Sequence, residues 1–316
     1  MINVSIIIVC MNNLKNLYPC LDSIKRYTTV SYETLVVAYL FSKENLDKLR
    51  NDYPWITIIE SNEIRGFSEN NNLALRQAKG KYCFVVNDDT EMKMPVIDQL
   101  VESFKYCPSN TAIISPVLVD LYDKVQFCGR PPFTLITFLL SLFHIYNKKK
   151  TIYVNQEGIF KSYNITGAAF LIRSDVFKKV GWFDERFFFC PEDIALSTLL
   201  NKSGYSCYVN SNVKLTHYEG MSGKSLSLIM TATKPAGHRG SLIFYGDTNI
   251  KLAIVRLISL IAYIAKFIYH RIRGLVNPCP NFFYILSIAD KNCIMACFSR
   301  KTPKEIFKKY YNRLHK

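Results

Sequence analysis

The sequence predicts an α/β fold with a doubly wound, mostly parallel β-sheet flanked by helices. Strand-like and helix-like segments alternate through the first part of the chain, and Val4–Val9 is a β-branched run typical of a strand buried on both faces. The acidic triplet Asn87-Asp88-Asp89 directly follows the apolar segment Tyr82–Val86. In such sheets ligands bind at the carboxyl ends of the strands, so a site is expected there.

The other elements before the acidic triplet follow the same alternation. Apolar residues at helical spacing predict a helix over Asn13–Tyr27, and β-branched or apolar runs predict strands at Thr34–Val37 and Trp55–Ile59. Two further helices are expected over Asn45–Asn51 and Asn70–Ala78.

After the triplet the pattern predicts more strands and helices and a loop-rich insert, Gln126–Lys150. Expected strands are Ala112–Val119, Ala168–Ile172, Tyr205–Val209 and Val213–Thr216, and expected helices are Pro95–Lys105, Ser174–Val180 and Ile194–Lys202. Gly204 is the expected residue after the last of these helices. A change to a helical, basic pattern places a domain boundary near Gly240. Residues 1–240 then form the α/β domain, with halves of about 1–110 and 111–240, and residues 241–316 form a basic helical tail.

Positive charge is concentrated at the carboxyl end. The formal net charge is +15, and the residues from Asn249 onward hold 13 Lys and Arg against 2 Asp and Glu. Such a tail predicts an anionic partner, either membrane lipid or nucleic acid. We expect no nucleic-acid binding, because the aromatic residues form no RNA-binding signature and the acids cluster where phosphates would have to lie.

The spacing of the ten cysteines does not indicate a zinc site. No pair has C-x-x-C spacing, and no histidine lies at zinc-finger distance. Met1 leads directly into Val4–Val9 without a basic signal region. We therefore expect a cytoplasmic protein with free thiols.

Three acidic or histidine-containing positions could carry chemistry. Carboxylates at Asn87-Asp88-Asp89 could hold Mg²⁺ or Mn²⁺ on a diphosphate, although Thr90 or Asp89 could instead cap a helix from Met92 onward. Glu192-Asp193 follows an aromatic run and could either present a base in a water-poor pocket or stabilise a helix start. His217 ends a strand-like stretch, where a single histidine can be a ligand or a structural residue.

Taken in order, these positions resemble the family 2 glycosyltransferases of the GT-A fold, in particular the rhamnosyl- and galactosyltransferase-like branch of surface-polysaccharide enzymes. The resemblance covers about Val4 to Ser222. The segments that carry it are Val4–Asn13, Gly66–Asn72, Asn87–Thr90, Gly167–Arg173, Gly181–Phe188, Glu192-Asp193 and His217.

The resemblance implies an inverting, metal-dependent transferase that moves a sugar from a nucleotide donor to a probably lipid-linked glycan. Asp89, His217 and Asn87 or Asp88 would hold Mn²⁺ or Mg²⁺, and Asp193 would be the general base. Glu192 would assist it and, with Trp182 and Asp184, would bind the acceptor. The implied donor-binding residues are Cys10, Asn12, Ala38, Gly66, Asn72, Asn87 and Asp88.

Two positions depart from the family pattern within the nucleotide site. Ala38 stands where the family has an aspartate at the end of its second strand, and Ile64 replaces an asparagine that precedes the Gly-Phe pair. An alternative function is therefore a catalytically weakened, partner-binding relative.

The segment Ile250–Arg273 is amphipathic at helical spacing. One arc is aliphatic, and the opposite arc holds basic residues among aromatic ones. This pattern predicts a helix that lies in an anionic membrane interface, so that the protein is peripheral on the inner face of the cell membrane. The alternative is a helix packed on the catalytic domain with its charges in water.

Overall fold

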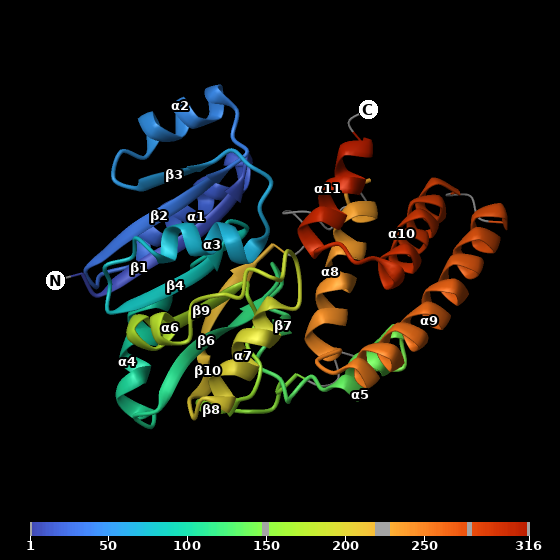
Figure 1. The fold of residues 1–316 in the computed structure, drawn as a ribbon. Coiled ribbons are helices and arrows are strands. Elements are labelled where there is room, and N and C mark those ends of the chain that lie inside the picture. Colours follow the sequence, from blue (N-terminus) through green and yellow to red (C-terminus); the bar gives the residue numbers. More distant parts are fainter. Residues whose placement is uncertain (1, 147–151, 219–227, 277–279, 315–316) are drawn as a thin grey trace. The chain divides into compact units, whose positions relative to one another are not determined.

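The computed structural model describes residues 2–146, 152–218, 228–276 and 280–314, and the chain divides into two compact units. The first, here called the sheet unit, consists of Met1–Pro132, Lys148–Asp184 and Asp193–Ser222. The second, the helical unit, consists of Phe133–Asn147, Glu185–Glu192 and Gly223–Lys316 (Figure 1).

Four parallel strands form the first half of the sheet, in the order β3-β2-β1-β4. They are β1 (Val4–Met11), β2 (Tyr32–Tyr39), β3 (Thr57–Ser61) and β4 (Tyr82–Asn87). The helices that connect them are α1 (Leu14–Tyr27), α2 (Lys43–Asp52) and α3 (Phe67–Leu75). β1 lies between β2 and β4, and its side chains contribute to the apolar clusters on both faces of the sheet, which explains its uninterrupted apolar sequence.

The second half of the sheet contains strands of both directions. They are β6 (Thr111–Val119), β9 (Ala169–Arg173), β10 (Ser206–His217), β5 (Thr90–Glu91), β7 (Val125–Phe127) and β8 (Ile159–Ser162). β9 runs antiparallel between β4 and β6, whereas β6 and β10 are parallel. The mostly parallel α/β fold expected from the sequence is confirmed, with β9 as its main antiparallel member.

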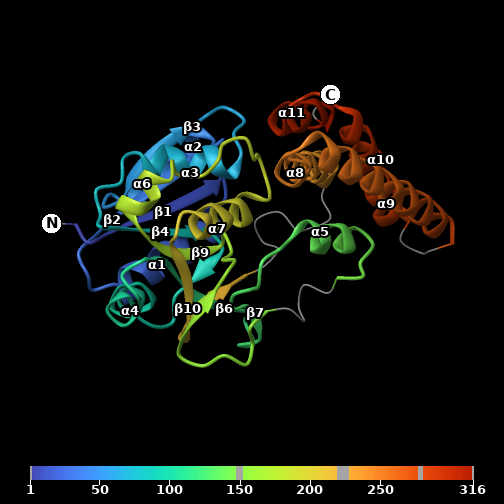
Figure 2. The same ribbon diagram turned by 60° about the horizontal axis from the view of Figure 1, so that its bottom comes forward.

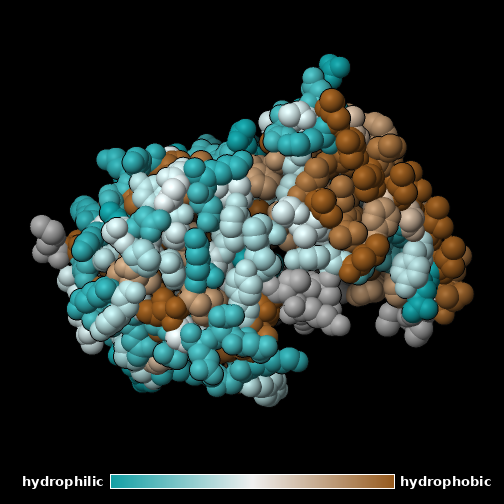
Figure 3. Space-filling view, turned by 90° about the horizontal axis from the view of Figure 1, so that it is seen from below, coloured by the Kyte–Doolittle hydropathy of each residue, from teal (hydrophilic) through white to brown (hydrophobic). Residues whose placement is uncertain are grey.

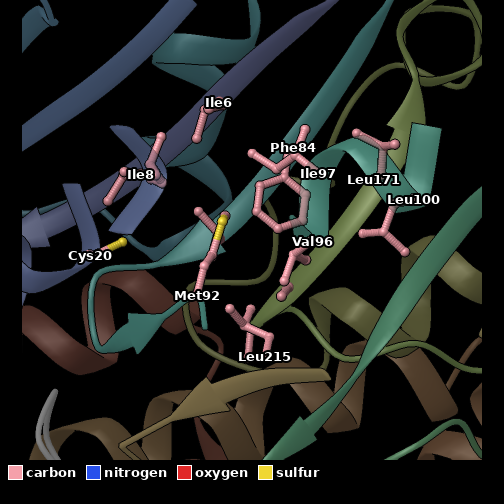
Figure 4. Close-up of a cluster of buried hydrophobic side chains, with 14 of the residues drawn as sticks. Ile6, Ile8, Cys20, Phe84, Met92, Val96, Ile97, Leu100, Leu171 and Leu215 are labelled. Atoms are coloured by element: carbon pink, nitrogen blue, oxygen red, sulfur yellow. The ribbon is translucent and has the colours of Figure 1, made fainter. Parts of the chain in front are cut away.

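Helices cover both faces of this sheet. Apolar residues of α1, α2 and α4 (Val96–Ser103) pack on one face, and those of α3, α6 (Ser174–Lys179) and α7 (Glu192–Lys202) pack on the other. Figure 2 shows α1 and α4 on one side of the sheet and α3, α6 and α7 on the other. In the first core, Ile6 and Ile8 of β1 and Phe84 of β4 lie with Val96 and Leu100 of α4 (Figure 4). A short 3₁₀ helix, η1, spans Phe104–Tyr106.

Three local expectations need correction or receive support. The two short strands predicted around 205–216 are one strand, β10. Its pairing with β6 shifts register between Asn210 and Lys214, which is why the sequence pattern predicted two strands. The insert 126–150 is not only loop, because it contains the end of β7 and α5 (Leu135–Leu142). Gly204 follows α7 with a φ of +83°, as expected for the residue after a helix.

The domain boundary expected near Gly240 falls inside a helix, α8 (Met230–Tyr245). Gly237 and Gly240 face the segment 185–192. A Cβ at Gly237 would lie 2.6 Å from the carbonyl oxygen of Phe189, and a Cβ at Gly240 would lie 2.5 Å from that of Cys190. These glycines permit close packing within the helical unit, so they do not mark its beginning. The other helices of this unit, besides α5, are α9 (Asn249–Val276), α10 (Pro280–Phe298) and α11 (Pro303–Leu314).

Helix α9 packs on its neighbours through a narrow side that contains Val255, Ser259, Ala262 and Tyr263. Its buried residues include Ser259 and Tyr263, which face α8 and α10, while a stripe of large aliphatic side chains is exposed. We call this the α9 stripe: Ile250, Ile254, Leu257, Ile261, Ile264, Ile268, Ile272 and Leu275. Hydrophobic residues gather over this part of the helical unit in Figure 3. Within the described residues, α9 is the one helix whose length and composition would allow it to cross a membrane.

Candidate active site

The site begins at the turn Asp88-Asp89, which connects β4 to β5 and is almost completely buried. The two-residue strand β5 pairs antiparallel with the end of β10, so that Thr90 lies opposite His217. The main-chain N–H of Tyr218 also donates to the carbonyl oxygen of Asp89 at 2.9 Å. This pairing brings a histidine more than a hundred residues away against the acidic turn.

His217 faces Asp89 in an orientation that a third residue fixes. Its Nε2 atom lies 3.3 Å from Oδ1 of Asp89. The amide nitrogen of Gln126 donates to the His217 carbonyl oxygen at 3.0 Å, and its Oε1 lies 2.9 Å from Nδ1 of the ring. Because Oε1 can only accept, Nδ1 must carry a proton. A neutral ring then presents the lone pair of Nε2 to the carboxylate.

Two electron-pair donors that face each other in this way fit a shared divalent cation. Two ligands of one cation, each at about 2.1 Å and at right angles, lie about 3 Å apart. The hydrogen bond from Gln126 to the second ring nitrogen is the usual support for a histidine ligand. In the described part of the chain no third His, Cys, Asp or Glu joins this pair as a preformed metal centre. The remaining positions suit substrate phosphate and water, which Mg²⁺ commonly retains.

Asn87 and Asp88, the other expected ligands, have different surroundings. Asn87 ends β4, and its N–H donates to the carbonyl oxygen of Ala168 at 2.9 Å. Burial raises the pKa of Asp88 to about 7, and the Cys10 thiol donates to its carboxylate. Asp88 is therefore directed toward the end of β1, whereas Asp89 is directed toward His217.

The expected donor-binding residues lie along the carboxyl edge of the parallel strands. Cys10 of β1 is paired with Ala38 of β2, and both are buried. Asn12, with a φ of 49°, accepts from the Ser42 N–H and the Asn45 side chain, so it supports the loop before α2.

Two further expected donor residues belong to α3. Gly66 precedes the helix, and its N–H donates to the Glu69 carboxylate at 3.1 Å. Asn72 is fully buried, and its amide exchanges two hydrogen bonds with the main chain of Phe183. The structure thus gives Asn72 a role in joining α3 to the loop before α7, and we omit it from the proposed donor site.

The expected base lies near the acidic turn within the sheet unit. Asp193 is in the first turn of α7, where its Oδ1 accepts from the Ile194 N–H at 2.7 Å. A Cβ at Gly167 would lie 3.4 Å from the Phe67 ring and 3.9 Å from Cβ of Asp193. Gly167 directly precedes Ala168, the partner of Asn87. Asp193, the start of α3 and the end of β4 therefore share one region.

The expected acceptor residues are half-buried or buried. Trp182, with a φ of 66°, is half-buried against Phe177. Asp184 is half-buried, and Glu192 is buried at the first position of α7. The division of the chain separates Glu192, in the helical unit, from its neighbour Asp193 in the sheet unit.

Sequence reasoning missed Gln126 and Arg65. Gln126 comes to the site only because β7 pairs with β6, which in turn pairs with β10, and no local pattern reveals this. Arg65 is half-buried after β3, with its N–H donating to the Tyr39 hydroxyl at 3.3 Å and its guanidinium bonded to Ser61 and Glu63. Its position directly before Gly66, in an already noted segment, was the available signal.

Gln126→Ala is expected to weaken Mn²⁺ affinity about 10- to 100-fold, measured by calorimetric titration in the presence of a nucleoside diphosphate. Without Gln126 the His217 ring loses the acceptor that holds Nδ1, although the fold loses no core side chain. Gln99→Ala, on α4 of the same unit, is the control and should leave affinity unchanged. Equal affinities for Gln126→Ala and the parent protein would contradict the positioning role.

Comparison with known proteins found a matching family and similar proteins. The family described as glycosyl transferase family 2 matches residues 5–181. The O-antigen biosynthesis protein RfbC of Myxococcus xanthus is 27% identical over 167 residues, which are 49% of this chain and 12% of that protein. The N-acetylglucosaminyl-diphospho-decaprenol L-rhamnosyltransferase of Mycobacterium tuberculosis (strain H37Rv) is 29% identical over 177 residues, 53% of this chain and 56% of that protein. The chain thus spans only part of these relatives.

Two solved structures share the fold. GalNAc-T7, crystallised with UDP, GalNAc and Mn²⁺, aligns with a TM-score of 0.55 and 16% identity over 72% of this chain and 46% of that one. The mannosyltransferase PcManGT of Pyrobaculum calidifontis, in complex with GDP-Man and Mn²⁺, aligns with a TM-score of 0.51 and 15% identity over 99% of this chain and 80% of that one. The expected GT-A-type architecture is confirmed.

Proposed function

Because the chain belongs to glycosyl transferase family 2, we propose that it transfers a sugar from a nucleotide-diphosphate donor to a hydroxyl of a lipid-linked glycan during bacterial surface-polysaccharide synthesis. The observation that carries this proposal is the pair formed by Asp89 and His217, oriented by Gln126 at the carboxyl edge of the sheet. The names of the two curated relatives, an O-antigen biosynthesis protein and a rhamnosyltransferase acting on a diphospho-decaprenol lipid, support the choice of acceptor.

The proposed reaction is a single displacement with inversion. The acceptor hydroxyl oxygen attacks C1 of the donor sugar while the bond from C1 to the nucleoside diphosphate breaks. Asp193 takes the hydroxyl proton, which makes the oxygen a better nucleophile as the new bond forms. Glu192, Trp182 and Asp184 are the proposed acceptor contacts.

Asp89 and His217 are the proposed holders of Mn²⁺ or Mg²⁺, with Asn87 and Asp88 beside them. When bound, such a cation neutralises charge on the leaving diphosphate. We place the nucleotide along the strand edge that holds Cys10, Asn12, Ala38 and Gly66. Arg65, directly before Gly66, adds a guanidinium group to this proposed donor site. Ala38 offers no carboxylate for pairing with a base, so we propose that main-chain groups make that contact.

The activity can be tested by incubating the protein with a panel of nucleotide sugars and a lipid-linked acceptor, with Mn²⁺, with Mg²⁺ or with chelator. Release of nucleoside diphosphate that requires both a cation and an acceptor would support the proposal. Absence of release with every donor would favour the alternative of a partner-binding relative, which the substitutions at Ala38 and Ile64 motivate.

The α9 stripe is the basis for proposing a peripheral position on the inner face of the cell membrane. Exposing aliphatic side chains to water is unfavourable. Single exposed apolar residues are normal on a protein surface, but a continuous stripe of them marks an interaction surface. Further large apolar side chains of the helical unit are exposed on α5 and α10: Ile136, Leu140, Phe282, Met295 and Phe298. The basic carboxyl-terminal region supplies attraction to anionic lipid.

Ile261→Asp is expected to lower binding to vesicles of phosphatidylcholine and phosphatidylglycerol about tenfold or more, because it removes an aliphatic group that would enter the membrane and adds repulsion from anionic headgroups. Vesicle flotation measures the bound fraction. Leu121→Asp is the matched control, since Leu121 is 59% exposed in the sheet unit and Ile261 is 53% exposed. Equal losses in both variants would remove the α9 stripe from the proposal.

A further inference from the structure

A charged cluster lies among α8, α9 and α10, on the side of α9 that faces away from the stripe. Its centre is Asp290 of α10, which is completely buried. The Asp290 carboxylate accepts from Nζ of Lys234 at 2.6 Å and from Nδ1 of His270 at 2.6 Å. Burying a carboxylate costs several kcal/mol, and such groups contribute little net stability even when paired. The cluster therefore calls for a role other than holding the helices together.

A second ammonium group, that of Lys266, lies beside the cluster against an aromatic ring. The Nζ atoms of Lys266 and Lys234 lie 5.3 and 5.5 Å from the centre of the same Tyr263 ring. Among the residues that the structure describes, Lys266 forms no ion pair with a carboxylate. Two ammonium groups thus stand against one carboxylate, which leaves an excess of positive charge in a half-buried place.

The electrostatics of the neighbouring groups agree with this excess. Burial lowers the pKa of Lys266, and the charge of Lys234 lowers it further. The pKa of His144, at the end of α5, is lowered first by Lys266 and then by burial. A bound anion would favour the charged forms of Lys266 and His144 and so raise the pKa of each. Phosphate oxygens are good acceptors for lysine ammonium groups.

We propose that Lys234, Lys266 and His270 form a binding site for the diphosphate of a lipid, the class of acceptor carrier that the proposed function requires. The site lies between helices, whereas the bulk phospholipid headgroups would meet exposed charges such as Arg271 and Arg273. An internal cluster of two ammonium groups suits a headgroup with two adjacent negative charges.

The test compares the full-length protein on two kinds of phosphatidylcholine vesicle with equal surface charge, one containing polyprenyl diphosphate and the other phosphatidylglycerol. We expect the parent protein to bind the diphosphate vesicles about tenfold more tightly, as one or two charge-assisted hydrogen bonds would produce. Lys266→Gln should lose this preference but keep its binding to phosphatidylglycerol. Lys251→Gln, the same charge change on the same helix, where Lys251 pairs with Asp247 at 2.9 Å, should keep both.

A parent protein without preference for diphosphate would overturn the proposal, as would equal effects of Lys266→Gln and Lys251→Gln. Lys266→Arg, which retains the charge, should retain the preference, and its loss there would mean that packing rather than charge is responsible. The carrier in this assay has no sugar, and the assay contains no donor and no metal. A protein without transferase activity would still bind it, so failure of the proposed function and failure of this site are distinguishable.

Discussion

Asp89→Asn is expected to abolish cation-dependent donor binding, with a loss of at least about a hundredfold, or roughly 3 kcal/mol. Asparagine retains the shape of this buried side chain but removes its charge, so a divalent cation loses its anionic protein ligand. Calorimetric titration of a nucleoside diphosphate in the presence of Mn²⁺ measures the effect. His217→Ala should weaken the same binding without unfolding the sheet unit, because His217 is at the end of β10.

Asp123→Asn is a suitable control, since Asp123 belongs to the same unit and its side chain is 73% exposed in a turn. It should bind donor and cation as the parent protein does. Asp88→Asn tests the neighbour, which is directed toward Cys10 and should have the smaller effect. Undiminished Mn²⁺-dependent donor affinity in Asp89→Asn would refute the assignment of this residue as a ligand.

Asp193→Asn is expected to reduce turnover by about 10²–10⁴-fold while donor affinity and folding stay close to those of the parent. The asparagine oxygen can still accept the Ile194 N–H, so the start of α7 is preserved. At neutral pH, however, an amide cannot take the proton of the acceptor hydroxyl. Steady-state transfer assays measure turnover, and circular dichroism reports on folding.

Asp175→Asn provides the matched control because Asp175 also lies in the first turn of a helix, α6, in the same unit. If charge at a helix start were all that mattered, the two variants would behave alike. Glu192→Gln separates the adjacent carboxylates and should mainly weaken the use of acceptor. Turnover of Asp193→Asn within about threefold of the parent would mean that the base is elsewhere, with Glu192 as the next candidate.

The alternation of elements in the sequence was sufficient to predict the parallel half of the sheet but not the direction of every strand. Val4–Val9 identifies a central strand, because only a strand covered on both faces tolerates such a run. β9 is also a short apolar run, and its side chains would be equally buried in either direction. Its antiparallel placement depends on the path of the chain outside the strand. Similarly, the bulged region of β10 looked like a strand end because polar residues interrupt it.

In the candidate site, the sequence located individual groups better than the contacts among them. The strand-end position of Asp89 follows from the local pattern. Its contact with His217 depends on a two-residue strand, β5, too short for any periodicity to reveal. For α9 the periodicity correctly separated an aliphatic arc from a polar one. It could not tell which residues face the other helices, and in the structure the large aliphatic side chains of the α9 stripe are exposed.

The helical unit is built from separate segments of the chain, and this has a consequence for folding during synthesis. Helix α5 belongs to this unit, and its Phe138 stacks on Tyr245 of α8 with ring centres 4.6 Å apart. The partner leaves the ribosome about 100 residues later, which at typical translation rates corresponds to about 5–20 s. During that interval the apolar side chains of α5 have no native surface to cover them, while the parallel strands of the sheet unit are already available. The nascent chain therefore passes through a stage at which the parallel half of the sheet can fold while α5 is still uncovered and prone to aggregation.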